Sequence, residues 1–97
     1  MKDYRFLQDA DEEMNEQARF YEGQSEGLGL DFLDEVEHTV KSILAFPKGG
    51  RVVSKNLRRR IMRRFPFGVL YAIEAEQIVI VAVAHLKRRP GYWKDRI

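Results

Sequence analysis

Two stretches in the first half of the chain carry apolar residues at the spacing of a helix face. The first stripe consists of Ala10, Met14, Ala18 and Tyr21. The second and stronger stripe consists of Phe32, Leu33, Val36, Val40, Ile43 and Leu44. Each predicts an amphipathic helix. Asp9, with Glu12 three residues later, is predicted to cap the first helix as in a capping box, and Pro47 ends the second. The glycine-rich segment 23–29 between them predicts an antiparallel helical hairpin.

Short apolar runs separated by turn residues fill the rest of the chain and are typical of strands. Strands are predicted at Leu57–Phe65, Val69–Glu74 and Gln77–Ala84, with a shorter extended stretch at Arg51–Ser54 and an N-terminal strand in "DYRFLQ". The run "IVIVAVA" does not alternate, which indicates a strand covered on both faces or covered by helices. The order β-α-α-β-β-β predicts a single α+β domain over 1–97, in which the helical hairpin packs on one face of a small, mainly antiparallel sheet.

Charge divides the chain into two unlike halves. Residues 1–47 contain four Lys or Arg and twelve Asp or Glu, whereas residues 48–97 contain thirteen and three. Either the halves neutralise each other within the fold, or the second half faces an anionic partner. The size of the cationic excess favours the second interpretation.

Other features of composition narrow the class of protein. The chain has no cysteine, which excludes disulfides and thiolate metal sites, and no cofactor or metal is expected. The N-terminus turns acidic where a secretory signal would become apolar, and no apolar run is long enough to span a bilayer. A soluble, cytoplasmic protein is the expectation.

The densest cationic run is "RRRIMRR", residues 58 to 64. Alternation along a strand gives this run two faces. The predicted buried face consists of Leu57, Ile61 and Phe65, and the predicted outward face of Arg58, Arg60, Met62 and Arg64. An anion-binding face and a solvated edge strand explain the outward arginines about equally well. Arg59 and Arg63 share the parity of the apolar residues, so they must reach an edge or a carboxylate.

The chain ends in "AHLKRRPGYWKDRI", directly after the buried strand. His85 could serve as a general acid or base, or could simply donate to a backbone carbonyl. Tyr92 and Trp93 lie among several cations, which suits base stacking with phosphate contact and equally suits docking on an acidic protein. A third interpretation is that Trp93 folds back as a lid on the sheet.

Three longer stretches resemble one protein family. They are "ARFYEGQSEGLGLDFLDEVEHTVKSILAFP" (18–47), "RRFPFGVLYAI" (63–73) and "IVIVAVAHLKRRPGYWKDR" (78–96). Together they are similar to the RelE/ParE superfamily of bacterial toxins, the toxin halves of type II toxin–antitoxin pairs. The resemblance implies a cytoplasmic protein that forms a hetero-oligomer with a small antitoxin encoded in the adjacent reading frame.

The superfamily has two modes of action, and this chain departs from one of them. RelE-like members resemble ribosome-dependent mRNA endoribonucleases, whereas ParE-like members poison DNA gyrase by binding. Gly68 stands where many of the nucleases carry an arginine, and Leu86 aligns with another frequent arginine unless the cluster shifts to Arg88. Tyr92 keeps the place of a nuclease tyrosine, and Arg59 could match a nuclease lysine. The loss of arginine at Gly68 favours a ParE-like, non-catalytic toxin.

The resemblance leaves two alternatives beside the gyrase poison. One is an mRNA endoribonuclease with His85, Arg88 and Tyr92 as catalytic residues, and the other is an inactive relative that binds antitoxin only. For a binding protein, the residues expected to contact target or antitoxin are Arg58, Arg60, Arg64, Arg89 and Trp93.

Overall fold

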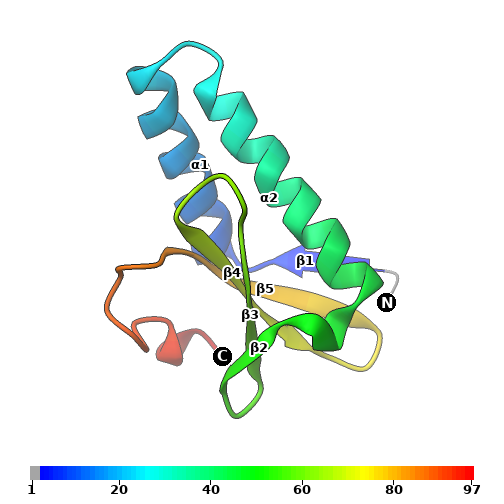
Figure 1. The fold of residues 1–97 in the computed structure, drawn as a ribbon. Coiled ribbons are helices and arrows are strands. Elements are labelled where there is room, and N and C mark those ends of the chain that lie inside the picture. Colours follow the sequence, from blue (N-terminus) through cyan, green and yellow to red (C-terminus); the bar gives the residue numbers. More distant parts are fainter. Residues whose placement is uncertain (1–2) are drawn as a thin grey trace.

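The fold places a helical hairpin on one face of a five-stranded sheet (Figure 1). The structure, a computed structural model, describes residues 3–97. Its elements are β1 (Asp3–Phe6), α1 (Gln8–Gln24), α2 (Leu28–Ala45), β2 (Arg51–Ser54), β3 (Leu57–Ile61), β4 (Phe67–Ile73) and β5 (Gln77–His85), with 3-10 turns η1 (Pro47–Gly49) and η2 (Lys94–Arg96). The strand order is β1-β5-β4-β3-β2, antiparallel except for the parallel pair β1 and β5. The predicted α+β class and element order are confirmed, and β2 occupies the stretch expected to be extended.

The ends of the helices differ from the capping prediction. α1 begins at Gln8 after Leu7, so Asp9 already lies inside the helix and no side chain caps its start. The predicted capping box is therefore wrong, and Glu12 accepts a hydrogen bond from the Gln8 amide at 3.0 Å. α2 starts after Gly27, which has a φ of 87° that only glycine adopts without strain.

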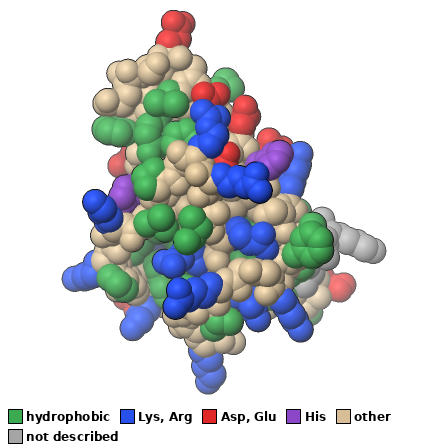
Figure 2. All heavy atoms as spheres, viewed as in Figure 1, with side chains coloured by type: hydrophobic (Ala, Val, Ile, Leu, Met, Phe, Trp, Pro, Cys, Tyr) green, Lys and Arg blue, Asp and Glu red, His purple; other side chains and the backbone are tan. Residues whose placement is uncertain are grey.

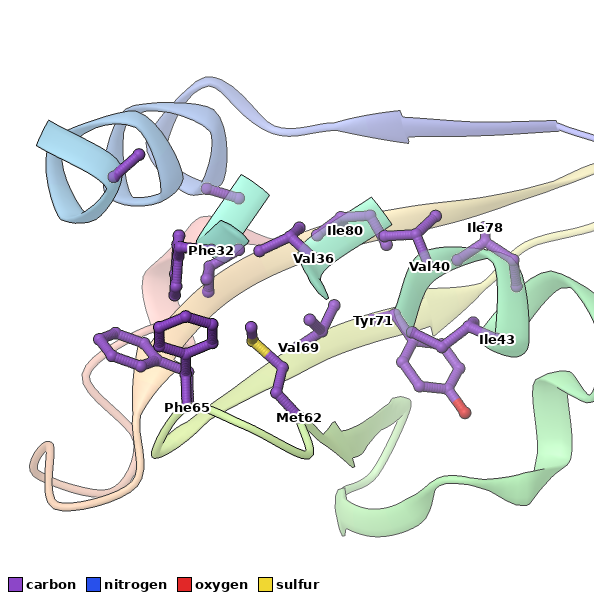
Figure 3. Close-up of a cluster of buried hydrophobic side chains, with 14 residues drawn as sticks. Phe32, Val36, Val40, Ile43, Met62, Phe65, Val69, Tyr71, Ile78 and Ile80 are labelled. Atoms are coloured by element: carbon purple, nitrogen blue, oxygen red, sulfur yellow. The ribbon is translucent and has the colours of Figure 1, made fainter. Parts of the chain in front are cut away.

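The main hydrophobic core lies between the helical hairpin and the sheet (Figure 3). Phe32 of α2 packs edge-on against Phe65 and Phe67, with both ring centroids 5.2 Å away. Met62 belongs to this core with 4% exposure, whereas Ile61 is 52% exposed. Both were predicted on the opposite faces, and both predictions are wrong. The reason is that the helices cover the face of β3 that carries Arg58, Arg60 and Met62, whereas Ile61 ends the strand on the opposite face.

The apolar run of β5 is buried on both faces of the sheet, as predicted, and a β-bulge within it changes which face the later side chains take. Leu70 pairs with Ala82 and Tyr71 pairs with Ile80, which leaves Val81 as an extra residue. Val81 and Ala82 therefore both face away from the helices and belong to the second core cluster. The bulge also places the His85 ring on the helix-covered face, edge-on to Phe67 at 5.1 Å.

The second face of the sheet is covered by the C-terminal segment, residues 86–97, which runs back toward the sheet in Figure 1. We call this face of the sheet the tail-covered face. Its buried cluster consists of Leu57, Leu70, Ala72, Val79, Val81, Ala82, Ala84 and Trp93. Trp93 is 8% exposed, so the interpretation of this residue as a lid on the sheet is the one that the structure shows. Within residues 3–97, neither long helix has the apolar length that a bilayer crossing requires.

Candidate functional site

A groove of about 570 Å³ opens on the tail-covered face, between β2 and the C-terminal segment. We call it the cationic groove, because the charged residues that line it are Arg51, Arg59, Arg88, Arg89 and Lys94. No carboxylate lines it, and none of the five cations forms an ion pair with any residue from 3 to 97. Figure 2 shows Lys and Arg side chains gathered over the sheet-bearing half of the molecule, with most Asp and Glu around the helices. The two halves of the chain thus do not neutralise each other here.

Arg59 contributes the cation of the groove that comes from β3. Its backbone pairs with Leu70, which places the side chain on the tail-covered face. The stem of Arg59 fills the space beside Gly68, because a Cβ added at Gly68 would lie 2.9 Å from its Cγ and Cδ atoms. Its Nε is buried without a hydrogen-bond partner among the described residues, and no carboxylate there reaches it. An arginine at position 68 would need the room that Arg59 already occupies.

His85 lies at the end of β5, where it lines both this groove and a neighbouring hollow beside α1. Its Nδ1 accepts a hydrogen bond from the Lys87 N–H at 3.0 Å. The predicted donation from the ring to a backbone carbonyl is not present among the described residues. With Nδ1 accepting, the proton of the neutral ring lies on Nε2.

Tyr92 places its ring, and not its hydroxyl, at the groove. The hydroxyl donates a hydrogen bond to Glu13 at 2.7 Å. Burial, this hydrogen bond and the negative charge of Glu13 raise the pKa of Tyr92 above its ordinary value. The Arg88 guanidinium lies over the ring, 4.0 Å from its centroid. The hydroxyl is therefore protonated at neutral pH and already has a partner.

Glu13 on α1 holds the C-terminal segment to the body of the protein. Beside Tyr92, it accepts two hydrogen bonds of 2.9 Å from Arg96 and one of 3.1 Å from the Val83 N–H. Arg96 also donates to the Val81 carbonyl at 3.0 Å, and its hydrogen bonds to Glu13 raise its pKa. We call Glu13, Tyr92 and Arg96 the Glu13 cluster.

The Glu13 cluster closes an open edge of the sheet. β1 pairs with β5 only as far as Ile80, so among residues 3–97 no strand lies beside the rest of β5 on that side. Unpaired backbone groups at such an edge need other partners. Glu13 accepts from the N–H of Val83, and Arg96 donates to the carbonyl of Val81. Glu13 was not predicted as a site residue, because nothing in the local sequence distinguishes it from the other carboxylates of α1.

The predicted outward row of arginines on β3 and the following turn is not formed. Arg58 donates to two carbonyls of the segment 48–50, at 3.1 and 2.9 Å. Arg60 donates to the Phe46 carbonyl at 3.0 Å, and Arg64 pairs with Asp31 of α2 at 3.6 Å. All three lie on the helix-covered side, because the end of α2 and η1 cover that face, so the expectation of a shared outward face is wrong. Their role as binding residues stays a prediction.

The predicted site residues of the C-terminal stretch, from both the catalytic and the binding candidates, do lie close together. His85, Arg88, Arg89, Tyr92 and Trp93 all line the groove. Arg88 and Arg89 are exposed, His85 and Tyr92 are half-buried, and Trp93 is buried. The cations are thus exposed, whereas the aromatic rings among them are packed against other parts of the protein. This arrangement suits the binding of an anionic surface better than stacking of the rings on a base.

Comparison with known proteins identifies the family. The family described as the ParE toxin of the type II toxin–antitoxin system, parDE, matches residues 4–90. The chain belongs to the ParE toxin family. Its structure is similar to a chain of the chromosomal ParDE TA system from P. aeruginosa, with a TM-score of 0.74 and 16% sequence identity over 88% of this chain and 96% of that chain. At this identity the likeness concerns the fold. A search of curated proteins finds no match.

Membership of the ParE family confirms the resemblance recognised in the sequence, including its ParE branch. The match spans β1 from Tyr4 onward, the helical hairpin, β2 to β5 and the start of the C-terminal segment. It ends at Pro90, before Tyr92, Trp93 and Arg96. The Glu13 cluster therefore joins α1, inside the matched region, to residues beyond it.

Proposed function

We propose that this ParE-family protein is the toxin of a type II toxin–antitoxin pair that binds and poisons an essential target, DNA gyrase, and does not cut RNA. The family match over residues 4–90 carries the proposal. A cognate antitoxin, encoded in the adjacent reading frame, neutralises it. The ParDE system similar in fold is itself a toxin–antitoxin assembly.

The chemistry of the groove supports binding over catalysis. A nuclease that uses general acid–base catalysis needs titratable groups that can exchange a proton near neutral pH. The hydroxyl of Tyr92 is bound to Glu13 and its pKa is raised, so it is a poor acid under those conditions. The five cations of the groove, which have no carboxylate partner among residues 3–97, instead support the binding of an anionic surface.

The alternative of an mRNA endoribonuclease has one observation in its favour. His85, Arg88 and Tyr92 lie together at the end of β5, with the Arg88 N–H donating to the His85 carbonyl at 2.9 Å and its guanidinium over Tyr92. In that mechanism the Nε2 atom of His85 would exchange the proton, and Arg88 would stabilise the developing charge.

Expression of the toxin without antitoxin in growing cells separates these functions. The gyrase poison is expected to cause filamentation and, with purified gyrase and supercoiled plasmid, to accumulate cleaved DNA. Rapid decay of mRNA with intact DNA would overturn the proposal in favour of the nuclease. Normal growth, with no cleaved DNA in the purified reaction, would show an inactive relative.

Two variants sharpen the test. In the gyrase reaction Arg88→Ala is expected to weaken the effect at least tenfold, since truncating an anchoring arginine costs about 2 kcal/mol, whereas His85→Ala has less than a threefold effect. In a nuclease, His85→Ala would lower the rate about a hundredfold or more. Arg19→Ala on α1 is the matched control, because Arg19 is exposed and lies outside the groove.

For the antitoxin, the expected observation is that the product of the neighbouring reading frame copurifies with the chain and restores growth. Arg64 remains a candidate contact, because its side chain is 60% exposed despite the pair with Asp31. Arg58 and Arg60 are poorer candidates, since their guanidinium groups already donate to backbone carbonyls.

A further inference from the structure

The cationic groove concentrates positive charge for which residues 3–97 offer no partner. Its cations come from three places in the chain, with Arg51 on β2, Arg59 on β3, and the remainder on the C-terminal segment. Other arginines of the same half do have partners, as Arg96 with Glu13 at 2.9 Å illustrates. Cations gathered from separate elements repel one another, and an anionic ligand would offset that cost.

Of the five cations, Arg59 gives the strongest indication of a bound anion. It is half-buried, its Nε is sealed from solvent, and its guanidinium donates no hydrogen bond to any described residue. Arg60 also has a buried Nε without a partner, but its terminal nitrogens donate to Ser42 and Phe46. A half-buried cation without a partner is unfavourable by itself, so the position of Arg59 suits an anion bound at the sheet end of the groove.

The lining favours a phosphate backbone over an acidic peptide. Four of the five cations are arginines, whose planar guanidinium groups bind phosphate in a bidentate manner. Peptide recognition relies on apolar anchors, and the exposed large apolar side chains of the groove are limited to Val52 and Leu86 among the described residues. Regularly spaced phosphates can engage several cations together and release counterions.

The aromatic residues of the groove indicate whether a bound nucleic-acid strand is contacted at its bases or only at its backbone. Trp93 is buried against the sheet, and the ring of Tyr92 is covered by the Arg88 guanidinium at 4.0 Å. Neither ring offers a face on which a base could stack. Contacts are therefore confined to the backbone, and binding is expected to be insensitive to base sequence.

We propose that the cationic groove binds one strand of DNA by its phosphate backbone, with Arg59 at the sheet end and Arg51 and Arg89 at the rim. The choice of DNA rests on the proposed function, because a protein that acts on gyrase meets the DNA that gyrase holds. The toxin then contacts the DNA of the complex as well as the enzyme.

Fluorescence anisotropy with the purified toxin tests this directly. The probes are a labelled 20-nucleotide DNA strand of mixed sequence, the same strand as a duplex, an RNA strand of the same sequence, and a 20-residue polyglutamate peptide. With five phosphate contacts on a single strand, the logarithm of the binding constant is expected to fall with the logarithm of salt concentration with a slope of about −3.5. A second DNA strand of different sequence is expected to bind within about twofold, since phosphate contacts carry no sequence information.

Variants locate the contacts. Arg51→Ala combined with Arg89→Ala is expected to reduce the slope by about 1.4 and to weaken binding of the DNA strand by about tenfold or more. Arg59→Met keeps the aliphatic stem beside Gly68 and removes the charge, and is expected to reduce the slope by about 0.7. Arg19→Ala removes one charge from the helical hairpin and should leave binding within about twofold. Equal thermal midpoints for all variants establish that they are folded.

Several outcomes would overturn the proposal. They are tighter binding of RNA than of either DNA probe, equal binding of polyglutamate, or the same loss in Arg19→Ala as in the groove variants. If DNA does not bind but the toxin still traps gyrase on plasmid, the groove proposal fails and the proposed function stands. If DNA binds as expected and gyrase is unaffected, the proposed function fails instead.

Discussion

On the helix-covered face of the sheet, fourteen residues form one buried cluster, whereas the tail-covered face buries eight under a short C-terminal segment. The arginines differ in the same way. Arg58 and Arg60 on the helix side donate to backbone carbonyls, while the cations of the groove on the other side have no carboxylate partner among residues 3–97. The helix-covered face therefore supplies most of the apolar burial. The tail-covered face combines a smaller core with cations that have no carboxylate partner among the described residues.

The largest expected effect tests the difference in burial. Phe32→Ala is expected to lower the free energy of unfolding by about 3–5 kcal/mol, because it leaves a cavity among three aromatic rings of the main core. Trp93→Ala on the tail-covered face is expected to cost about 3 kcal/mol or less, since the C-terminal segment can shift to fill part of the space. Urea denaturation measures both, and Phe20→Ala, at 56% exposure, is the control. Equal losses at the two positions would contradict the comparison.

A smaller effect tests what holds the C-terminal segment in place. Glu13→Gln keeps the shape of the side chain but leaves the Arg96 guanidinium, whose side chain is 14% exposed, with only the 3.5 Å ion pair to the exposed Asp9. Because the pair is only partly buried, we expect a loss of about 2 kcal/mol in the free energy of unfolding, measured by urea denaturation. Glu16→Gln, on the same helix and exposed, should change it by less than about 0.5 kcal/mol. A Glu13 variant as stable as the control would show that the cluster does not anchor the segment.

The smallest effect is a dependence on high pH. The folded state raises the pKa of Tyr92 above its ordinary value of 10.0, so folding favours the protonated hydroxyl. Its contribution is fully present below pH 10 and is lost as the pH rises beyond it. After allowance for solvent screening, the loss between pH 9 and pH 11 should stay below about 1 kcal/mol. Tyr92→Phe is expected to flatten this part of the stability profile, and an unchanged profile would show that the hydroxyl is not held.

Local sequence patterns predicted the helices and strands, but they did not predict which face of the sheet each side chain lies on. The helical hairpin follows from apolar spacing, and the buried last strand from its unbroken apolar run. The bulge at Val81 could not be predicted, because Val81 and Ala82 are equally acceptable on either face. Strand alternation could not say which face the helices cover, so Arg58 and Arg60 were assigned to the wrong side.

The candidate site was predicted only in part, for a similar reason. Its C-terminal residues stand together in the sequence and were recognised there. Glu13 lies 79 and 83 residues from Tyr92 and Arg96, and one carboxylate among many on α1 has no local signature. Contacts at that separation depend on the completed fold, so they are visible only in three dimensions.

The parallel pairing of β1 with β5 has a consequence for the time at which the toxin acquires its structure. Asp3 lies opposite Gln77 in the sheet, so β1 cannot pair until β5, which is synthesised after it, has been made. Contacts between distant parts of a chain form late, because a long loop must close first. The anchoring of the C-terminal segment to α1 comes later still. We expect a nascent chain to lack its groove until β5 and the C-terminal segment have both left the ribosome.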